Sequence, residues 1–408
     1  MSEKIRTFLG TDGQQVHADN QPDLKLVPFE LQPVKIKDAK DIPHRKWLLG
    51  NHLIRGYVTL LAAPGATGKS SLILAWCMGI AIGRSLVGGH LFQQCNTALL
   101  NLEDPEDEMD RRVSAIAQHY NIWDDDISGR FFMSPADRRV TIAAQSSDGY
   151  TIWHPDEEAI IERILRDKIG LLAVDPFAES HTLEENSNPQ MIQAAAAWRR
   201  VARKGNCAVC LAHHFRKGPA DGIESARGAK SLTDSARVGL VMSSMTEDEA
   251  TALGIAPEER LRYVRVDDAK MNLAPRAARA TWLHLTHATL ENQDDIYRSG
   301  DSVVVIEQWQ MPALWEKFTN ADLNAILDDV DAGLGEGVRY SPQKNSAEWV
   351  GRLLVTKFNV TEAQATQMIG QWLANGTLEK STYRHPIQRK DRMGVTVCDA
   401  KRPGTEIK

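Results

Sequence analysis

The feature that most constrains the fold is a glycine-rich turn set between two apolar runs. The first run, residues 57–62 (YVTLLA), is rich in β-branched and apolar residues and predicts a buried strand. The turn reads Ala-Pro-Gly-Ala-Thr-Gly-Lys-Ser over residues 63–70, and the second run, residues 72–82 (LILAWCMGIAI), predicts a buried helix. A strand, a turn ending in Gly-Lys-Ser and a helix in this order are typical of a P-loop, which binds the phosphates of a nucleotide.

The chemistry of a P-loop assigns roles within this turn. Main-chain N–H groups from Gly65 to Lys69 are expected to surround a phosphate at the N-terminus of the helix, where unpaired N–H groups and the helix dipole favour anions. The Lys69 ammonium is expected to reach the β- and γ-phosphates of ATP, and the Ser70 hydroxyl to bind Mg²⁺. The predicted nucleotide-binding residues are Pro64, Gly65, Ala66, Thr67, Gly68, Lys69, Ser70 and Ser71.

The first position of the turn departs from the usual pattern, which has glycine where this chain has Ala63. Alanine makes the same turn only if its φ angle is negative. The alternative to a phosphate site is a glycine-rich turn between a strand and a helix, with a solvated lysine.

The composition restricts the class of protein and its partners. Of 408 residues, 42% are hydrophobic and 25% are charged, which suits a soluble chain of roughly two to three domains. The formal net charge of −6 gives no overall attraction to DNA, so DNA binding must come from local basic segments. The five cysteines follow no disulfide spacing, and no apolar run suits a signal peptide or a membrane span. We therefore expect a cytoplasmic protein with no membrane partner.

Two further predicted strands end in carboxylates. Residues 97–102 lead into Glu103, and residues 169–174 lead into Asp175. We expect the first of these strands to adjoin the P-loop strand, so that Glu103 lies where ligands bind in open α/β sheets and acts as a general base. Asp175 follows four apolar residues, as in the Walker B pattern, where a carboxylate joins the Mg²⁺ shell. The alternative for Glu103 is a charged strand end that begins a turn.

Cysteines and histidines occupy another predicted strand, residues 207–214 (CAVCLAHH). Cys207, Cys210 and His213 have a compact spacing that zinc sites use, but a fourth ligand is missing and strand alternation places the two cysteines on opposite faces. Buried strand thiols are therefore the favoured interpretation. A polar group at the end of this strand can hydrogen-bond a γ-phosphate, and His213 and His214 are the candidates. A buried core histidine is the alternative for one of them.

The segment after this strand, residues 215–228, is rich in glycine and charged residues and has no periodicity. We expect a mobile loop, and such loops on a rigid sheet often carry function. The predicted DNA-binding residues in and beside it are Arg216, Lys217, Arg227 and Lys230. A solvated charged loop is the alternative. Further strands are expected up to about residue 285, with a turn at 268–272 that carries Lys270.

The chain divides into three predicted parts. Residues 1–41 are polar and without periodicity, which favours a flexible arm. Residues 42–298 form the predicted α/β core with a mostly parallel sheet. Residues 299–408 show short helical patterns followed by a polar hairpin pattern, which resembles a winged-helix module, and Lys and Arg exceed Asp and Glu from residue 376 onward. A protein-interaction module is equally compatible with this pattern.

In this order, the motifs resemble the RepA-type hexameric helicases of plasmids and phages, within the RecA- and DnaB-like P-loop ATPases. The stretches that carry the resemblance lie between residues 42 and 290: Ala63–Ser70, Leu102–Pro105, Leu172–Asp175, Glu184–Asn186, Leu211–His214 with Lys217–Gly218, Ala226–Gly228, Leu232–Arg237, Met242–Thr246 and Ala269–Asn272. The resemblance implies a RecA-like ATPase core that uses ATP and Mg²⁺ and assembles as a homo-oligomeric ring, a hexamer in that family.

The resemblance also implies roles for individual residues. The catalytic roles fall on Lys69, Glu103, His214 and Arg237, and Mg²⁺ binding falls on Ser70 and Asp175. Glu103 resembles the residue that activates water, and His214 resembles the γ-phosphate sensor. Arg237 falls where the family places an arginine finger that acts on the nucleotide of the neighbouring subunit. Arg112 and Lys270 are further candidates near the subunit boundary, and the loop at 215–228 resembles the one that faces the central channel.

The predicted activity is hydrolysis of ATP coupled to movement along single-stranded DNA in plasmid or phage replication, with a replication initiator or a primase as a further partner. The rival prediction is a non-translocating, ATP-gated DNA-binding or regulatory ATPase that recruits replication or recombination factors. Both use the same nucleotide pocket. They differ in whether single-stranded DNA strongly stimulates ATP turnover and whether a tailed duplex is unwound.

Overall fold

The structure, a computed structural model, describes residues 8–9, 15–16, 31–135, 137–145, 152–214, 235–253, 255–277, 280–310 and 318–403. The chain separates into two compact units, residues 1–45 and 46–408. In the first unit, strands β1 (Phe8–Leu9) and β2 (Gln15–Val16) pair in antiparallel fashion, and the 3₁₀ helix η1 (Ala39–Asp41) follows. Every residue from 31 to 45 is exposed, so this part of the unit contributes nothing to a core.

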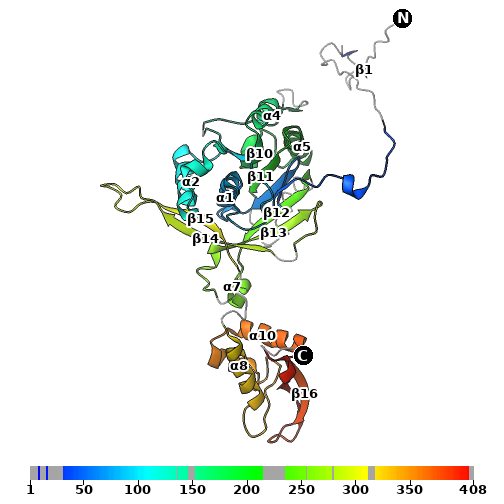
Figure 1. The fold of residues 1–408 in the computed structure, drawn as a ribbon, viewed down its shortest axis with the longest axis vertical. Helices are drawn as coiled ribbons and strands as arrows, with labels where there is room; N and C mark the ends of the chain where they lie inside the picture. Colours follow the sequence, from blue (N-terminus) through cyan, green and yellow to red (C-terminus); the bar gives the residue numbers. More distant parts are fainter. Residues whose placement is uncertain are drawn as a thin grey trace. The chain divides into compact units, whose positions relative to one another are not determined.

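A nine-stranded mixed sheet forms the centre of the second unit, in the order β15-β14-β13-β12-β5-β11-β10-β6-β7 (Figure 1). The strands from β12 to β7 are parallel, whereas β13, β14 and β15 run antiparallel along one side. The central strands β5 and β10 are apolar almost throughout because both faces of the sheet are covered, and all of their residues are buried. The predicted α/β class, with a mostly parallel central sheet, is confirmed.

The strands of this sheet are β5 (Val58–Ala63), β6 (Asn96–Asn101), β7 (Phe131–Met133), β10 (Ile169–Asp175), β11 (Ala208–His214), β12 (Val238–Ser244), β13 (Tyr263–Met271), β14 (Thr281–Thr289) and β15 (Ser302–Gln308). Two short antiparallel pairs lie outside it, β3 (Trp47–Leu49) with β4 (Leu53–Ile54) and β8 (Ala144–Gln145) with β9 (Ile152–Trp153). Small helical elements are α3 (Asp124–Ile127), α7 (Glu247–Leu253), η2 (Phe177–Ser180), η4 (Arg260–Arg262) and η5 (Asp399–Lys401).

Helices cover both faces of the sheet. On one face, α1 (Lys69–Ile82) and α2 (Glu106–Tyr120) share a core with the antiparallel strands, and on the other, α4 (Glu157–Arg166) and α5 (Asn188–Gly205) pack on β10 and β11. Helix α1 is buried almost all round, so it carries no polar face, and its ends are set by Gly68 and Gly83, both in the left-handed conformation. Among the described residues, no helix is both long and apolar enough to cross a membrane.

The structure corrects three details of the sequence prediction. The strand before Glu103, β6, does not adjoin the P-loop strand β5, because β11 and β10 lie between them. Lys270 lies within β13 and not in a turn. The sheet continues past residue 298, because β15 pairs with β14 along its whole length.

The C-terminal segment contains three helices followed by a two-stranded hairpin, the element order expected of a winged-helix module. The elements are α8 (Asn320–Ala332), α9 (Gly351–Phe358), α10 (Glu362–Asn375), β16 (Leu378–Arg384) and β17 (Asp391–Val397). Helices α8 and α10 begin with capping boxes, in which Thr319 pairs with Asp322 and Thr361 pairs with Gln364. Residues from all five elements form a hydrophobic core separate from those of the sheet.

Candidate functional site

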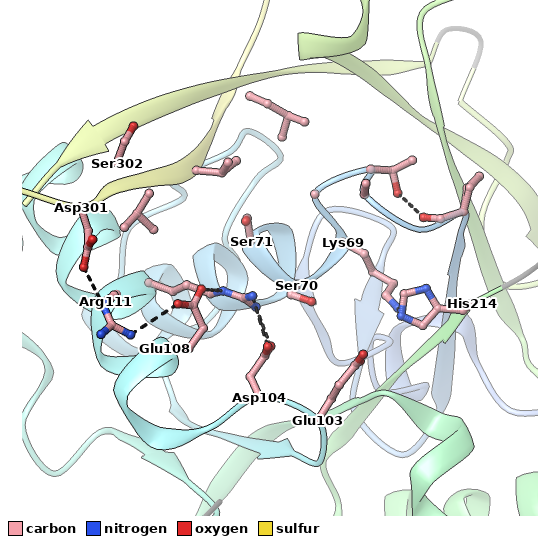
Figure 2. A pocket seen from close by; sticks show the side chains of 18 residues that line it. Lys69, Ser70, Ser71, Glu103, Asp104, Glu108, Arg111, His214, Asp301 and Ser302 are labelled. Atoms are coloured by element: carbon pink, nitrogen blue, oxygen red, sulfur yellow. Dashed lines mark hydrogen bonds and ion pairs between the residues drawn. The ribbon is translucent and has the colours of Figure 1, made fainter.

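The predicted P-loop joins the carboxyl end of β5 to the N-terminus of α1 and lines a cavity of about 680 Å³ (Figure 2). Ala63 ends β5 and is absent from the residues with positive φ, so alanine fits there without strain. Gly68 has a φ of +78°, and a Cβ atom built on it would lie 2.5 Å from a methyl carbon of Leu285 in β14. Only glycine therefore suits this position.

The remaining residues of the loop set its shape. The Thr67 hydroxyl donates a hydrogen bond of 2.8 Å to the carbonyl oxygen of Pro64, which closes the turn. Ala66 has a φ of +62°, a left-handed conformation that is uncommon outside glycine. Ser70 and Ser71 lie in the first turn of α1, at the end of the helix where anions are favoured, and both line the cavity.

Lys69 is the buried cation of this cavity, with 3% of its side chain exposed. Its Nζ atom lies 2.7 Å from Nε2 of His214 and 3.5 Å from Oδ1 of Asp175. Since an ammonium can only donate, the His214 Nε2 atom accepts this hydrogen bond. Burial lowers the pKa of Lys69, and the charges of Asp175 and Glu103 partly oppose that effect.

Asp175 ends the buried strand β10 and meets Lys69 beneath the P-loop. Its Oδ1 atom is buried and has no hydrogen-bond partner among the described residues, although the Lys69 ammonium lies within ion-pair distance. An orphaned carboxylate oxygen fits a hydrated Mg²⁺ ion, which is commonly held by one carboxylate, a hydroxyl, phosphate oxygens and water. Within the described residues, no cluster of three or more His, Cys, Asp or Glu residues could hold a metal ion by itself.

Glu103 lies in the loop between β6 and α2 and lines the same cavity. Figure 2 shows its carboxylate directed toward the space beside Lys69 and His214. It makes no hydrogen bond or ion pair with the described residues, in contrast to its neighbour Asp104, which binds Arg112 through both oxygens at 2.7 and 3.3 Å. A carboxylate that is not already paired is the kind that can accept a proton from water.

The side chains of the two histidines at the end of β11 lie in different environments. His214 faces Lys69, and its pKa is lowered by burial and by the Lys69 charge. His213 packs edge-on against Phe177 with ring centroids 6.2 Å apart, and its Nδ1 atom is buried without a partner among the described residues. Burial, with the charge of Lys69, lowers the pKa of His213 to about 4. His214 is therefore the histidine that faces the phosphate loop.

Charged residues line the cavity on the side of α2, and of these Arg112 was predicted from the sequence, whereas Arg111, Glu108 and Asp301 were not. Arg111 donates to Asp301 at 2.9 Å, and Arg112 donates to Glu108 at 2.9 Å as well as to Asp104. Ser302, Val303 and Val304 of β15 complete the lining. Arg112, predicted near a subunit boundary, thus lines the P-loop cavity of its own chain. No local motif marks Asp301, because it reaches the cavity only through the pairing of β15 with β14.

Arg237 lies at the opposite edge of the sheet from the P-loop. We call the edge where the parallel strands end the carboxyl edge, and the edge where they begin the amino edge. Arg237 precedes β12, whose Val238 pairs with Thr59 at the start of β5. It lines a second cavity, of about 370 Å³, together with Arg199 and Arg203 of α5. Lys270 lies close by, because Gly239 pairs with Lys270 across β12 and β13.

Among the described residues that line the second cavity, these three arginines have no acidic neighbour. Arg199 donates to the carbonyl oxygen of Ser235 at 3.0 Å, and no ion pair joins Arg199, Arg203 or Arg237 to a described carboxylate. Burial lowers the pKa of Arg199, and the charges of Arg203 and Arg237 add to that effect. Three positive charges in one cavity favour the binding of an anion there.

Two further groups of predicted residues remain, the candidate DNA-binding residues and the cysteines of β11. The candidate DNA-binding residues Arg216, Lys217, Arg227 and Lys230 lie outside the described residues. Cys207 and Cys210 belong to the cores on opposite faces of the sheet, and burial raises the pKa of each thiol to about 12. The geometry is that of buried strand thiols, as favoured from the sequence, and not that of a shared metal site.

Comparison with known proteins gives two findings. A family model described as AAA domain matches residues 26–220, the part of the chain that holds the P-loop, Glu103, Asp175 and His214. A solved structure of a DnaB-like replicative helicase and its interactions with primase is 14% identical in sequence, with a TM-score of 0.40, and the match covers 57% of each chain. The chain thus spans little more than half the length of that helicase, and a likeness of this size does not carry its activity across.

Proposed function

We propose that this protein is an ATPase of the RecA/DnaB-like kind that assembles as a ring and moves on single-stranded DNA. One observation carries the proposal. Asp175 and His214 both lie within 3.5 Å of the Lys69 ammonium group, and the Glu103 carboxylate is directed at the same space. Asp175 and His214 end strands β10 and β11, whereas Lys69 begins α1 after the P-loop and Glu103 follows β6. All four therefore lie at one edge of the parallel sheet. ATP is the substrate that this set fits, and the AAA domain match over the same residues supports it.

The side chains divide the work of phosphoryl transfer. Main-chain N–H groups at 65–69 and the Lys69 ammonium would bind the phosphates, and the Ser70 hydroxyl and the Asp175 carboxylate would hold Mg²⁺, which neutralises phosphate charge. Glu103 would take a proton from the attacking water, and His214 would contact the γ-phosphate. Positioning and charge dominate such a reaction, because the protein forms no covalent bond to phosphate.

The ring is proposed from Arg237. This residue lies at the amino edge, away from the P-loop of its own chain, so it can complete a nucleotide site only in a second copy. An arginine finger supplied in trans would couple each hydrolysis event to the neighbouring subunit. The loop with Arg216, Lys217, Arg227 and Lys230 is proposed to contact single-stranded DNA, and an initiator or primase is proposed as a further partner.

The test measures ATP turnover by the full-length protein with and without single-stranded DNA, and displacement of a labelled strand from a tailed duplex. A translocating helicase gives DNA-stimulated turnover and ATP-dependent strand displacement, both lost in Lys69→Ala. Turnover without displacement points to the regulatory ATPase. If the rate of ATP turnover is the same with and without DNA at every salt concentration, the DNA part of the proposal is contradicted. The ATPase assignment is not affected by that result.

A further inference from the structure

The P-loop cavity contains charged side chains to which the proposed reaction gives no role. Its described lining residues include three cations and four carboxylates, which are Lys69, Arg111, Arg112, Glu103, Asp104, Glu108 and Asp301. Of these, the proposed function uses only Lys69 and Glu103. The other five lie beside the reacting groups and form contacts with one another, so they are candidates for a positioning role.

The two arginines of α2 each have two carboxylate partners. Arg112 binds Asp104 at 2.7 Å and Glu108 at 2.9 Å. Arg111 binds Asp301 at 2.9 Å and lies 3.7 Å from Glu108. The dashed lines in Figure 2 join these groups along one side of the cavity. Their side chains are 23–52% exposed, and ion pairs at such exposure contribute little to the stability of a fold. Stability alone therefore does not account for this network.

Glu103 stands apart from the network. It forms no hydrogen bond or ion pair with the described residues. Its charge nevertheless acts on Lys69 and on His214, because it raises the pKa of each against the effect of burial. Lys69 in turn pairs with Asp175. Each lysine or arginine of the described lining thus has a carboxylate partner other than Glu103, and the carboxylate proposed to accept a proton stays unpaired.

The main chain around Glu103 is held independently of the arginines. Asn101, 5% exposed at the end of β6, accepts a hydrogen bond from the Asp104 N–H at 3.2 Å and donates one to the Asp104 carbonyl oxygen at 2.6 Å. The Leu102 N–H donates to the carbonyl oxygen of Asp175 at 2.9 Å. These bonds use no side-chain atom of Asp104. Its carboxylate can therefore be changed while the loop that carries Glu103 stays in place.

We propose that Asp104 is a positioning residue, which binds Arg112 and thereby keeps this guanidinium from pairing with Glu103. The role rests on the proposed function, in which Glu103 accepts a proton from water. Both carboxylates are directed into the same cavity from consecutive residues, so a guanidinium released by one can turn to the other (Figure 2). A carboxylate held by a guanidinium accepts a proton less readily. Asp104 would thus act through Arg112 and not on the substrate.

The test is a double-mutant cycle on ATP turnover by the full-length protein, with Asp104→Asn and Arg112→Met made alone and together. Asp104→Asn keeps the shape of the side chain and removes its charge. We expect kcat to fall roughly 10–10²-fold, a part of the 10²–10⁴ that a general base contributes. In the Arg112→Met background the same change should lower kcat no further, because methionine leaves no guanidinium to pair with Glu103.

Two measurements separate this effect from damage to the fold. Asp104→Asn should bind a fluorescent, non-hydrolysable ATP analogue as tightly as the parent, because the P-loop is unchanged, and it should keep the parent's melting temperature. Asp104→Glu keeps the charge and should retain more turnover than Asp104→Asn. The matched control is Asp107→Asn, which removes the same charge from an exposed position of α2 outside the cavity lining and should turn over like the parent.

Parent-like kcat in Asp104→Asn overturns the proposal, and so does an equal fold loss in both backgrounds, since Asp104 would then not act through Arg112. Weaker analogue binding with unchanged kcat also overturns it and assigns Asp104 to nucleotide binding. Glu103→Gln, measured in parallel, tests the proposed function separately. If Glu103→Gln is inactive and the cycle shows no coupling, only the role of Asp104 fails. If Glu103→Gln turns over like the parent, the base assignment and the role of Asp104 both fail.

Discussion

The carboxyl and amino edges of the parallel sheet differ in the charged groups that they hold. At the carboxyl edge, the Lys69 cation lies beside the Asp175 carboxylate, and Glu103 faces the same cavity. At the amino edge, Arg199, Arg203 and Arg237 share a cavity without a described carboxylate. The first edge contains the groups proposed to bind phosphate and activate water, whereas the charged residues described in the second cavity are arginines, which keep their charge near neutral pH. This difference supports the proposal that a second copy of the chain brings the two edges together.

Replacing Lys69 by alanine should have the largest effect, because it removes the buried cation at the carboxyl edge. ATP hydrolysis is expected to fall to background and nucleotide binding to weaken. Phosphate release and titration with a fluorescent nucleotide measure the two effects. Lys204→Ala, which removes a lysine 52% exposed on α5, is the control and should retain turnover. Parent-like turnover in Lys69→Ala would refute the P-loop assignment.

Replacing Arg237 by alanine tests whether the amino edge acts on a second copy. Loss of an arginine finger lowers turnover by roughly 10³–10⁵. Mixing Arg237→Ala with Lys69→Ala should restore part of the activity, because some interfaces then join an intact P-loop to an intact finger. Light scattering establishes that mixed oligomers form. If they form and no activity returns even in single-turnover measurements, Arg237 does not act in trans.

Replacing Glu103 by glutamine should separate catalysis from binding at the carboxyl edge. Turnover is expected to fall by roughly 10²–10⁴, the usual contribution of a general base. Nucleotide affinity should be preserved, because glutamine keeps the size of the side chain and Glu103 forms no hydrogen bond or ion pair with the described residues of the P-loop. Glu106→Gln in the first turn of α2 is the matched control. Normal turnover in Glu103→Gln would place the base elsewhere.

Arg200 and Arg203, three residues apart on α5, distinguish function from stability at the amino edge. Arg203 lines the cavity with Arg237, whereas Arg200 forms a bidentate pair with Glu157, which is 5% exposed. Arg203→Ala is expected to lower turnover by about tenfold, equivalent to about 1.4 kcal/mol in the barrier. Arg200→Ala should instead lower stability by about 1–3 kcal/mol, because the buried Glu157 carboxylate loses its hydrogen bonds to Arg200 and keeps only the Lys204 ammonium at 3.9 Å as an ion-pair partner. Equal effects on turnover would remove Arg203 from the site.

The last prediction concerns pH and the partly buried His213 side chain at the carboxyl edge. Burial lowers the pKa of His213 to about 4 from an ordinary 6.5, so the folded chain keeps it neutral while the unfolded chain binds a proton. The contribution of neutral His213 to the free energy of unfolding is therefore fully present above pH 6.5, and it falls by about 1–3 kcal/mol as the pH drops toward 4. Urea unfolding measures this slope. His213→Gln should reduce it, and the exposed His44→Gln should not.

Much of the carboxyl edge is predictable from the sequence because its residues follow strands with strong local patterns. Asp175 and His214 end apolar runs, and the P-loop motif fixes Lys69 by itself. The order of the strands is not local information, which is why β6 was wrongly expected to adjoin β5. Asp301 was missed for the same reason, since it lies just before β15, far from its partner Arg111 in the chain.

The packing of Leu285 against Gly68 limits how this chain can evolve. A mutation of Gly68 meets two obstacles, a backbone at +78° that other residues adopt with strain and a methyl group that would lie 2.5 Å from the new Cβ atom. Shortening Leu285 relieves the second obstacle and leaves the first. No single compensating substitution at Leu285 can therefore rescue a side chain at Gly68, so the neighbouring antiparallel strand adds a second barrier to mutational drift in the phosphate loop.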